Sequence, residues 1–209
     1  MFTGAKNGII KGVRERVILK KIFTIILLVT SFICCSLLIF LNVCFEKVLV
    51  NGESMYPTLK DQELGLYLKK NFIVGGIKRN DIVIFEHENN SYEDKLFIKR
   101  VIGLPNEKVE IKENGSIYIN EEKIKQDYLD LEQNTNTYQI INSERMELIL
   151  KEDEYFVLGD NRGNSYDSRF FGPIKKDVIL GKLCLIYGHQ EEKQNSGKIT
   201  KYFFPIKLF

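Results

Sequence analysis

One strand-forming stretch sets the expected fold of this chain: KLFIKRVIGLP, residues 95–105. Its centre is rich in β-branched and aromatic residues, and Pro105 follows it, which is typical of a strand that leads into a turn. In an extended strand, Lys99 lies on the same face as Phe97 and Val101. The stretch therefore predicts a strand that carries a lysine among apolar side chains.

Similar short stretches recur on both sides of it. They are β-branched or aromatic, mostly with a period of two, and sustained helical periodicity occurs only in residues 22–45. Asn114-Gly115 lies between two of them and predicts a hairpin turn, because both central residues of that turn favour positive φ. We expect an all-β domain with strands at residues 47–50, 63–68, 81–85, 95–103, 109–111, 116–119, 146–150, 155–158 and 183–187.

Three segments do not follow this pattern. Residues 126–145 and 190–198 are polar, so we interpret them as a surface excursion and a loop. The aromatic C-terminal residues 199–209 predict a final strand that closes the core. The alternative is that they help the domain rest on a bilayer, because aromatic and basic residues favour the membrane interface.

Residues 22–45 form a segment of a different kind, IFTIILLVTSFICCSLLIFLNVCF. These 24 residues contain no Asp, Glu, Lys, Arg, Gly or Pro. A helix of this length spans roughly 36 Å, enough for a tilted transmembrane helix. A cleavable signal peptide is the alternative, but its apolar run is usually about 7–15 residues and ends at a small-x-small site. We therefore expect an uncleaved anchor in a lipid bilayer.

The charges predict which side each part occupies. Six basic residues and one acidic residue precede the anchor, a net charge of +5 in residues 1–21, and positive flanks stay in the cytoplasm. Residues 46–209 carry 24 basic and 27 acidic residues, a net charge of −3. Nucleic-acid binding normally requires a basic domain, so no such partner is expected. We expect a cytoplasmic segment at 1–21, an anchor at 22–45 and one extracytoplasmic domain at 46–209 in a plasma-membrane protein.

A serine lies shortly after the anchor, in Ser54-Met55-Tyr56-Pro57-Thr58. Pro57 fixes φ, so this turn can hold a hydroxyl in one place, although a serine before such a turn is more often a capping residue. A serine hydroxyl becomes a nucleophile only when a nearby base takes its proton. The two histidines, His87 and His189, have polar surroundings typical of surface residues. A different base is needed.

Lys99 is the candidate for that base. A lysine accepts a proton only when it is neutral, and burial in apolar surroundings can lower its pKa from about 10.4 by several units. Phe97, Ile98 and Val101 supply such surroundings. The ordinary alternative is that Lys99 and Arg100 are exposed charges on an edge strand.

A third block, residues 159–169, supplies opposite charges at two-residue spacing: Asp160 with Arg162, and Asp167 with Arg169. Its glycines allow tight turns. From the residues alone this block is a rigid, salt-bridged loop. Since His, Cys, Asp and Glu have no metal-ligand spacing in the sequence, no metal or cofactor is expected.

Anchor, serine block, lysine block and residues 159–169, in this order, resemble the type I signal peptidases, Ser/Lys proteases that cut signal peptides from exported preproteins. The resemblance extends from the anchor to about Tyr187. It implies a strongly bent antiparallel β-sheet, barrel-like catalytic domain. Because the base is lysine and not histidine, it implies the bacterial form.

The resemblance also implies roles for particular residues. Ser54 and Lys99 correspond to the catalytic dyad, and Ser165 to a serine that hydrogen-bonds the lysine. The site's geometry is held by residues corresponding to Asp160, Arg162, Asp167 and Arg169. Shallow pockets for small side chains before the cleaved bond, as in Ala-x-Ala, correspond to Met55, Leu59 and Ile98.

The chain departs from the family pattern at several turns. Asn80 and Asn106 replace glycines, but Asn tolerates the left-handed conformation, so both turns should survive. Gly52 replaces a serine that donates to the oxyanion in some relatives. The oxyanion would then depend chiefly on the Ser54 backbone N–H.

Three other functions fit parts of the sequence. A self-cleaving Ser/Lys repressor would need a DNA-binding segment in place of the anchor. A catalytically silent β-domain that assists surface-protein assembly would not need both Ser54 and Lys99. A peptidase dedicated to one client has the same sequence features as a general one.

Overall fold

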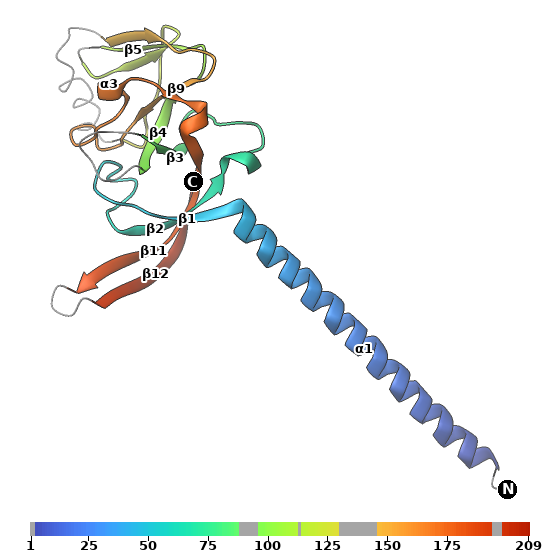
Figure 1. The fold of residues 1–209 in the computed structure, drawn as a ribbon. Helices are drawn as coiled ribbons and strands as arrows, with labels where there is room; N and C mark the ends of the chain where they lie inside the picture. The colour runs from blue at the N-terminus through green and yellow to red at the C-terminus, as the bar shows by residue number, and fades with distance from the viewer. Residues whose placement is uncertain (1–2, 88–95, 113, 130–145, 194–197) are drawn as a thin grey trace. The chain divides into compact units, whose positions relative to one another are not determined.

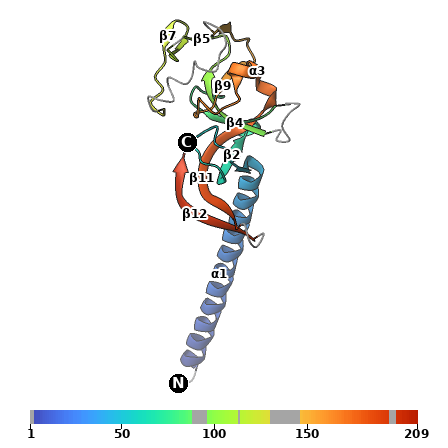
Figure 2. The ribbon, with the colours of Figure 1, turned by 90° about the vertical axis from the view of Figure 1, so that its left-hand side faces the viewer.

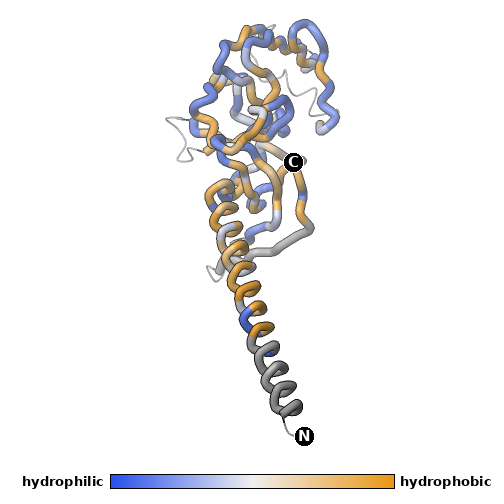
Figure 3. The backbone as a smooth tube through the Cα atoms, turned by 90° about the vertical axis from the view of Figure 1, so that its right-hand side faces the viewer, coloured by the Kyte–Doolittle hydropathy of each residue, from blue (hydrophilic) through white to orange (hydrophobic). Residues whose placement is uncertain are grey.

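The computed structural model describes residues 3–87, 96–112, 114–129, 146–193 and 198–209. The chain divides into two compact units, Met1–Cys44 and Phe45–Phe209. The first is one helix, α1 (Thr3–Cys44). Its part Ile18–Cys44 has 27 residues and a mean hydropathy of 2.8, long and apolar enough to cross a membrane. Figure 3 shows hydrophobic residues along most of this part.

The second unit consists mainly of antiparallel strands in two sheets (Figure 1). The larger sheet contains β1 (Phe45–Leu49), β2 (Glu63–Lys69), β3 (Ile82–Glu86), β4 (Leu96–Gly103), β9 (Glu154–Leu158), β10 (Ile174–Lys175), β11 (Ile179–Lys193) and β12 (Lys198–Leu208). The smaller one contains β5 (Lys108–Ile111), β6 (Ile117–Ile119), β7 (Glu122–Lys123) and β8 (Met146–Ile149). Short helices are η1 (Lys70–Phe72), α3 (Ser168–Phe171) and η2 (Lys176–Val178).

The larger sheet is bent around β11. This strand pairs with β3 near its start, with β2 along its middle and with β12 towards its end, and each of these pairings contains at least one register shift. Figure 2 shows the resulting curve of β11 and β12. The strand order β1-β2-β11-β3-β4-β9-β10 has two separate ends. The bent antiparallel fold is therefore confirmed, but the sheet is not a closed barrel, because β1 and β10 do not pair with each other.

Three apolar clusters hold the strands together. One joins β1, β2 and β11 to the turn after β1 through Val50, Met55 and Leu59. A second packs the smaller sheet against Ile102 of β4 and its neighbours. The third lies around Phe85, Val101 and adjacent strands. The neighbours of Lys99 on β4 belong to these clusters, with Ile98 in the first, Ile102 in the second and Val101 in the third, so the fold provides apolar surroundings for the lysine.

Each expected strand has a counterpart in the structure, with ends that differ by a few residues. The hairpin at Asn114-Gly115 is also present: Gly115 has φ 76°, and Lys112 N–H donates to Ser116 O at 3.0 Å. The substituted turns survive as expected, since Asn80 and Asn106 have φ 70° and 65°.

The loop expected at residues 190–198 is wrong. β11 continues to Lys193 and β12 begins at Lys198, so only residues 194–197 of that range lie outside both strands. Main-chain pairing between the two strands supports a polar ribbon that has no apolar alternation. The expected C-terminal strand is confirmed as β12, but it does not close the core at its end, where Ile206 and Leu208 are 63 % and 76 % exposed. Of the excursion expected at 126–145, residues 130–145 lie outside the described residues.

Candidate active site

Ser54 lies in the turn that follows β1. This turn is closed by main-chain bonds, including Leu59 N–H to Met55 O at 2.9 Å. The loop of residues 159–169 also binds this turn. Asn161 donates its backbone N–H to Ser54 O at 3.0 Å and its side-chain amide to Glu53 O at 3.1 Å. Because two segments fix the backbone of Ser54, its hydroxyl has a defined position.

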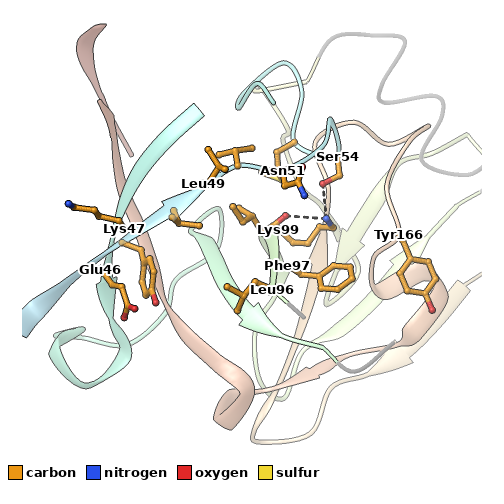
Figure 4. Close-up of a pocket in the computed structure, with 14 residues that line it drawn as sticks. Glu46, Lys47, Leu49, Asn51, Ser54, Leu96, Phe97, Lys99 and Tyr166 are labelled. Carbon is orange, nitrogen blue, oxygen red and sulfur yellow. Dashed lines mark hydrogen bonds between the residues drawn. The ribbon is translucent and has the colours of Figure 1, made fainter. Parts of the chain in front are cut away.

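Lys99 reaches that hydroxyl from the middle of β4. Its Nζ lies 2.8 Å from Ser54 Oγ and 3.2 Å from Ile98 O. It also lies 5.4 Å from the centre of the Phe97 ring. Figure 4 shows both hydrogen bonds. Strand and turn therefore bring together two residues that are 45 positions apart.

Lys99 is only 3 % exposed. Burial lowers the pKa of Lys99 from 10.5 to about 8. Asp167 and Asp160 act in the opposite direction, because nearby negative charge favours the protonated amine, whereas Arg169 helps to lower the pKa. A substantial fraction of Lys99 is therefore neutral near pH 8.

Three charged residues of the third block are fully buried: Asp160, Arg162 and Asp167. Asp167 and Arg169 form the expected pair, with Arg169 Nε 2.8 Å from Asp167 Oδ1 and Nη2 2.8 Å from Oδ2. Asp167 also accepts the Gly159 N–H at 3.0 Å. These bonds connect α3 to the start of the loop whose Asn161 binds the backbone of Ser54.

Asp160, in the loop after β9, has a partner on β4. Arg100 donates Nε to Asp160 Oδ1 at 2.9 Å and Nη2 to Oδ2 at 2.5 Å. Its guanidinium lies 4.0 Å from the Tyr128 ring centre. Arg162 donates Nε to Gly159 O at 2.9 Å, and Nη2 to Gln126. The block therefore packs as a buried charged network and not only as a set of local pairs.

The expected bond from Ser165 to Lys99 is not formed. Ser165 Oγ is buried and has no hydrogen-bond partner among the described residues. It faces the backbone of Gly159, where a Cβ would lie only 2.1 Å from it. Ser165 therefore packs against the loop next to the lysine without bonding to the amine.

A pocket of about 430 Å³ opens at Ser54 and Lys99. Met55 and Ile98 line it, as the resemblance implies for substrate contacts. Leu59 does not line it, because this side chain is fully buried in the cluster behind Met55. The full lining consists of Glu46, Lys47, Val48, Leu49, Val50, Asn51, Ser54, Met55, Tyr67, Leu96, Phe97, Ile98, Lys99 and Tyr166.

Sequence reasoning missed several residues of the site. The sequence predicts no role for Arg100 beyond its place next to Lys99, and only the alternation of the strand indicates that its side chain lies on the opposite face. Gln126 lies at the start of the predicted surface excursion, but it is buried and bonded to Arg162. No role is predicted for Tyr166, which lines the pocket. Within the described residues, no group of three or more His, Cys, Asp or Glu is placed to hold a metal ion.

A serine hydroxyl beside a buried lysine amine, in a mainly apolar pocket, is the arrangement of a serine hydrolase with a lysine base. The chain matches the family "Signal peptidase, peptidase S26" over residues 19–188. It is 35 % identical to signal peptidase I U of Bacillus subtilis, covering 80 % of this chain and 89 % of that protein.

It is also 38 % identical to signal peptidase IB of Staphylococcus aureus, covering 64 % of this chain and 73 % of that protein. A solved signal peptidase I from Enterococcus faecalis is 32 % identical, with a TM-score of 0.43 over 53 % of this chain and 98 % of that one. The chain belongs to the signal peptidases of peptidase family S26.

Proposed function

We propose that Ser54 and Lys99 are the nucleophile and the general base with which this signal peptidase removes signal peptides from exported preproteins. The observation that carries the proposal is the 2.8 Å contact between Lys99 Nζ and Ser54 Oγ. The depressed pKa of Lys99, about 8, supports it, because a base must be unprotonated to act.

The reaction would proceed in two halves. Neutral Lys99 takes the Ser54 proton, Ser54 Oγ attacks the scissile carbonyl, and the C–N bond breaks as Lys99 returns the proton to the leaving amine. Lys99 then deprotonates a water molecule, which attacks the acyl-enzyme ester; the ester C–O bond breaks, Lys99 returns the proton to Ser54 Oγ, and the signal peptide leaves with a free carboxylate. The Ser54 backbone N–H is the proposed oxyanion donor. The Gly52 N–H donates to Asp61 Oδ1 at 2.7 Å, so it is not proposed as a second oxyanion donor.

The substrate would lie in the pocket as an extended chain. Its walls come from β1 with the residues that follow it, and from the first half of β4. β1 is the last strand at one end of the sheet, so its outer edge has no partner among the described strands. β4 pairs with β9 only from Arg100 onward, so the same is true of the edge of β4 before Arg100 that faces the pocket. Met55 and Ile98 would contact the small residues of an Ala-x-Ala type sequence.

The membrane arrangement is part of the same proposal. The chain carries a helix suited to crossing a membrane, preceded by a strongly basic segment. We infer that residues 1–21 lie in the cytoplasm, 22–45 in the plasma membrane and 46–209 outside, where preproteins emerge.

Purified full-length protein and a preprotein substrate test the dyad. Ser54→Ala and Lys99→Ala should each abolish processing, and the double variant should be no worse, since residues that act as one unit are not additive. Lys99→Arg should also fail, because guanidinium stays protonated. For the wild type, kcat/KM should rise with pH through about 8, as the neutral fraction of Lys99 grows.

Near-normal turnover by Lys99→Arg would show that positive charge, and not a free amine, is needed, and the dyad would have to be given up. Processing that survives in Ser54→Ala would exclude the serine mechanism. Circular dichroism of each variant separates loss of chemistry from loss of fold.

A further inference from the structure

Two exposed aromatic side chains lie on the loop and helix next to the dyad. Tyr166 and Phe170 are 37 % and 47 % exposed. Their rings stack, with centres 5.4 Å apart and an angle of 25° between the planes. Exposed aromatic pairs are common in binding surfaces, since they offer large apolar area at little cost in side-chain entropy.

The pair has a rigid support. Asp167 follows Tyr166 in the sequence, caps α3, which carries Phe170, and accepts a hydrogen bond from the Gly159 N–H. The segment that carries both aromatic residues is therefore bonded to the start of the loop of residues 159–169. Phe171 lies behind Tyr166, with ring centres 5.4 Å apart, and packs against the core. The pair is therefore held in position relative to Lys99 before any ligand arrives.

Tyr166 lines the same pocket as Ser54 and Lys99. Figure 4 shows Lys47 and Leu49 of β1 on one side of the dyad and Tyr166 on the other. A chain that runs along β1 and past Ser54 would therefore continue towards Tyr166. The pocket thus has two ends, with the reacting groups between them.

The two ends suit different parts of a substrate. Apolar side chains from β1, the Ser54 turn and β4 surround the first end, among them Val48, Met55 and Ile98. This end suits the apolar residues that precede the bond in a signal peptide. The residues that follow the bond then belong to the end with Tyr166.

We propose that Tyr166 and Phe170 form a binding surface for the first residues after the scissile bond, the start of the mature protein, and favour apolar and aromatic side chains there. This inference rests on the proposed function of Ser54 and Lys99. The pair acts by holding the leaving segment, so Tyr166 and Phe170 are specificity-determining residues and take no part in proton transfer.

Two peptide substrates test it with the full-length enzyme. Both share the same residues up to the scissile bond; one ends there in a small chromogenic amine, and the other continues for several residues, beginning with Phe or Leu. In the Tyr166→Ala/Phe170→Ala variant, the ratio of kcat/KM for the extended substrate over the short one should fall about 3- to 10-fold, the scale of one or two lost aromatic contacts. Most of the change should appear in KM.

Matched variants define the cause. Tyr166→Phe should retain the ratio, because the ring and not the hydroxyl makes the contact. Tyr118→Ala removes an aromatic side chain from β6 in the other sheet and should leave the ratio unchanged. A series of extended substrates with Ala, Leu or Phe directly after the bond should show a wild-type preference for Leu and Phe that the double variant loses.

An unchanged ratio in the double variant would overturn the inference, as would equal losses on both substrates, which would mean that the pair only supports Lys99. Failure of the dyad proposal is recognised separately, by activity of Ser54→Ala or Lys99→Ala on either substrate. Equal thermal unfolding midpoints for the variants exclude a general loss of structure.

Discussion

Lys99 shows how one side chain can be adapted for chemistry at the cost of stability. The protonated amine is disfavoured inside the protein, which lowers its pKa from 10.5 to about 8. Each pKa unit corresponds to about 1.4 kcal/mol of free energy. The same burial that provides a neutral base near pH 8 therefore weakens the folded state at lower pH.

We expect Lys99→Met to be more stable than the wild type at pH 7, by on the order of 3 kcal/mol, the free-energy equivalent of the shift. Between about pH 8 and 10.5 the unfolded lysine binds a proton that the folded one does not, so wild-type stability rises with pH. The advantage of the variant should shrink over that window. Urea unfolding in detergent at several pH values measures this, and equal stability at pH 7 would contradict it.

Arg100 and Asp160 form a buried ion pair, with side chains 8 % and 0 % exposed. Arg100→Met should leave the Asp160 carboxylate buried without its bidentate partner and cost about 3–5 kcal/mol. The double variant Arg100→Met/Asp160→Asn should lose much less than the sum of the single changes. Urea unfolding of the four proteins measures the coupling.

Lys108→Met provides the matched control for that pair. Lys108 and Glu147 are 2.7 Å apart but 30 % and 38 % exposed, so breaking this pair should destabilise the protein far less than breaking the buried pair. Additive losses at Arg100 and Asp160 would show that the pair is not coupled.

At the scale of elements, the site depends on the close approach of two turns. An ideal Cβ at Gly159 would lie 2.1 Å from Ser165 Oγ and 2.4 Å from the backbone oxygen of Ser54. Both distances are far below van der Waals contact. The glycine therefore lets the loop of residues 159–169 lie directly on the turn that carries the serine.

Gly159→Ala should lower kcat/KM for preprotein by at least about 10-fold, because a shift of about 1 Å in a reacting group can cost 10²-fold. Adding Ser165→Gly removes the clash with the hydroxyl but not the one with Ser54 O. The double variant should therefore remain impaired, as a processing assay would show. Full recovery in the double variant would mean that only Ser165, and not the serine turn, is displaced.

Elements also differ in how far the sequence predicts them. β4 and β9 coincide with apolar, β-branched runs, so the sequence pattern alone predicts these two strands. The polar end of β11 exists because β12 supplies backbone partners, and pairing with another strand leaves no periodic signal in the sequence of β11 itself. For the site, motif order predicted Ser54 and Lys99, whereas the Arg100–Asp160 bond joins two blocks in space and required the fold.

At the scale of the whole molecule, the proposed function requires the catalytic unit and the emerging preprotein to be on the same side of the membrane. The charge of residues 1–21 predicts that side, because net +5 precedes the apolar segment and net −3 follows it. The fold of Phe45–Phe209 gives no information about orientation, since a soluble β-domain is stable in either compartment.

We therefore expect a tag at the N-terminus to be protected when intact spheroplasts are treated with protease, while a tag after Phe209 is removed. Permeabilised spheroplasts should lose both tags, which controls for intrinsic protease resistance. Replacing Lys20 and Lys21 with Glu lowers the net charge of residues 1–21 from +5 to +1, so part of the protein should invert, because Lys and Arg close to the membrane set the orientation. Inverted molecules should not process preproteins. Protection of the C-terminal tag in the wild type would place the catalytic unit in the cytoplasm and contradict the proposed arrangement.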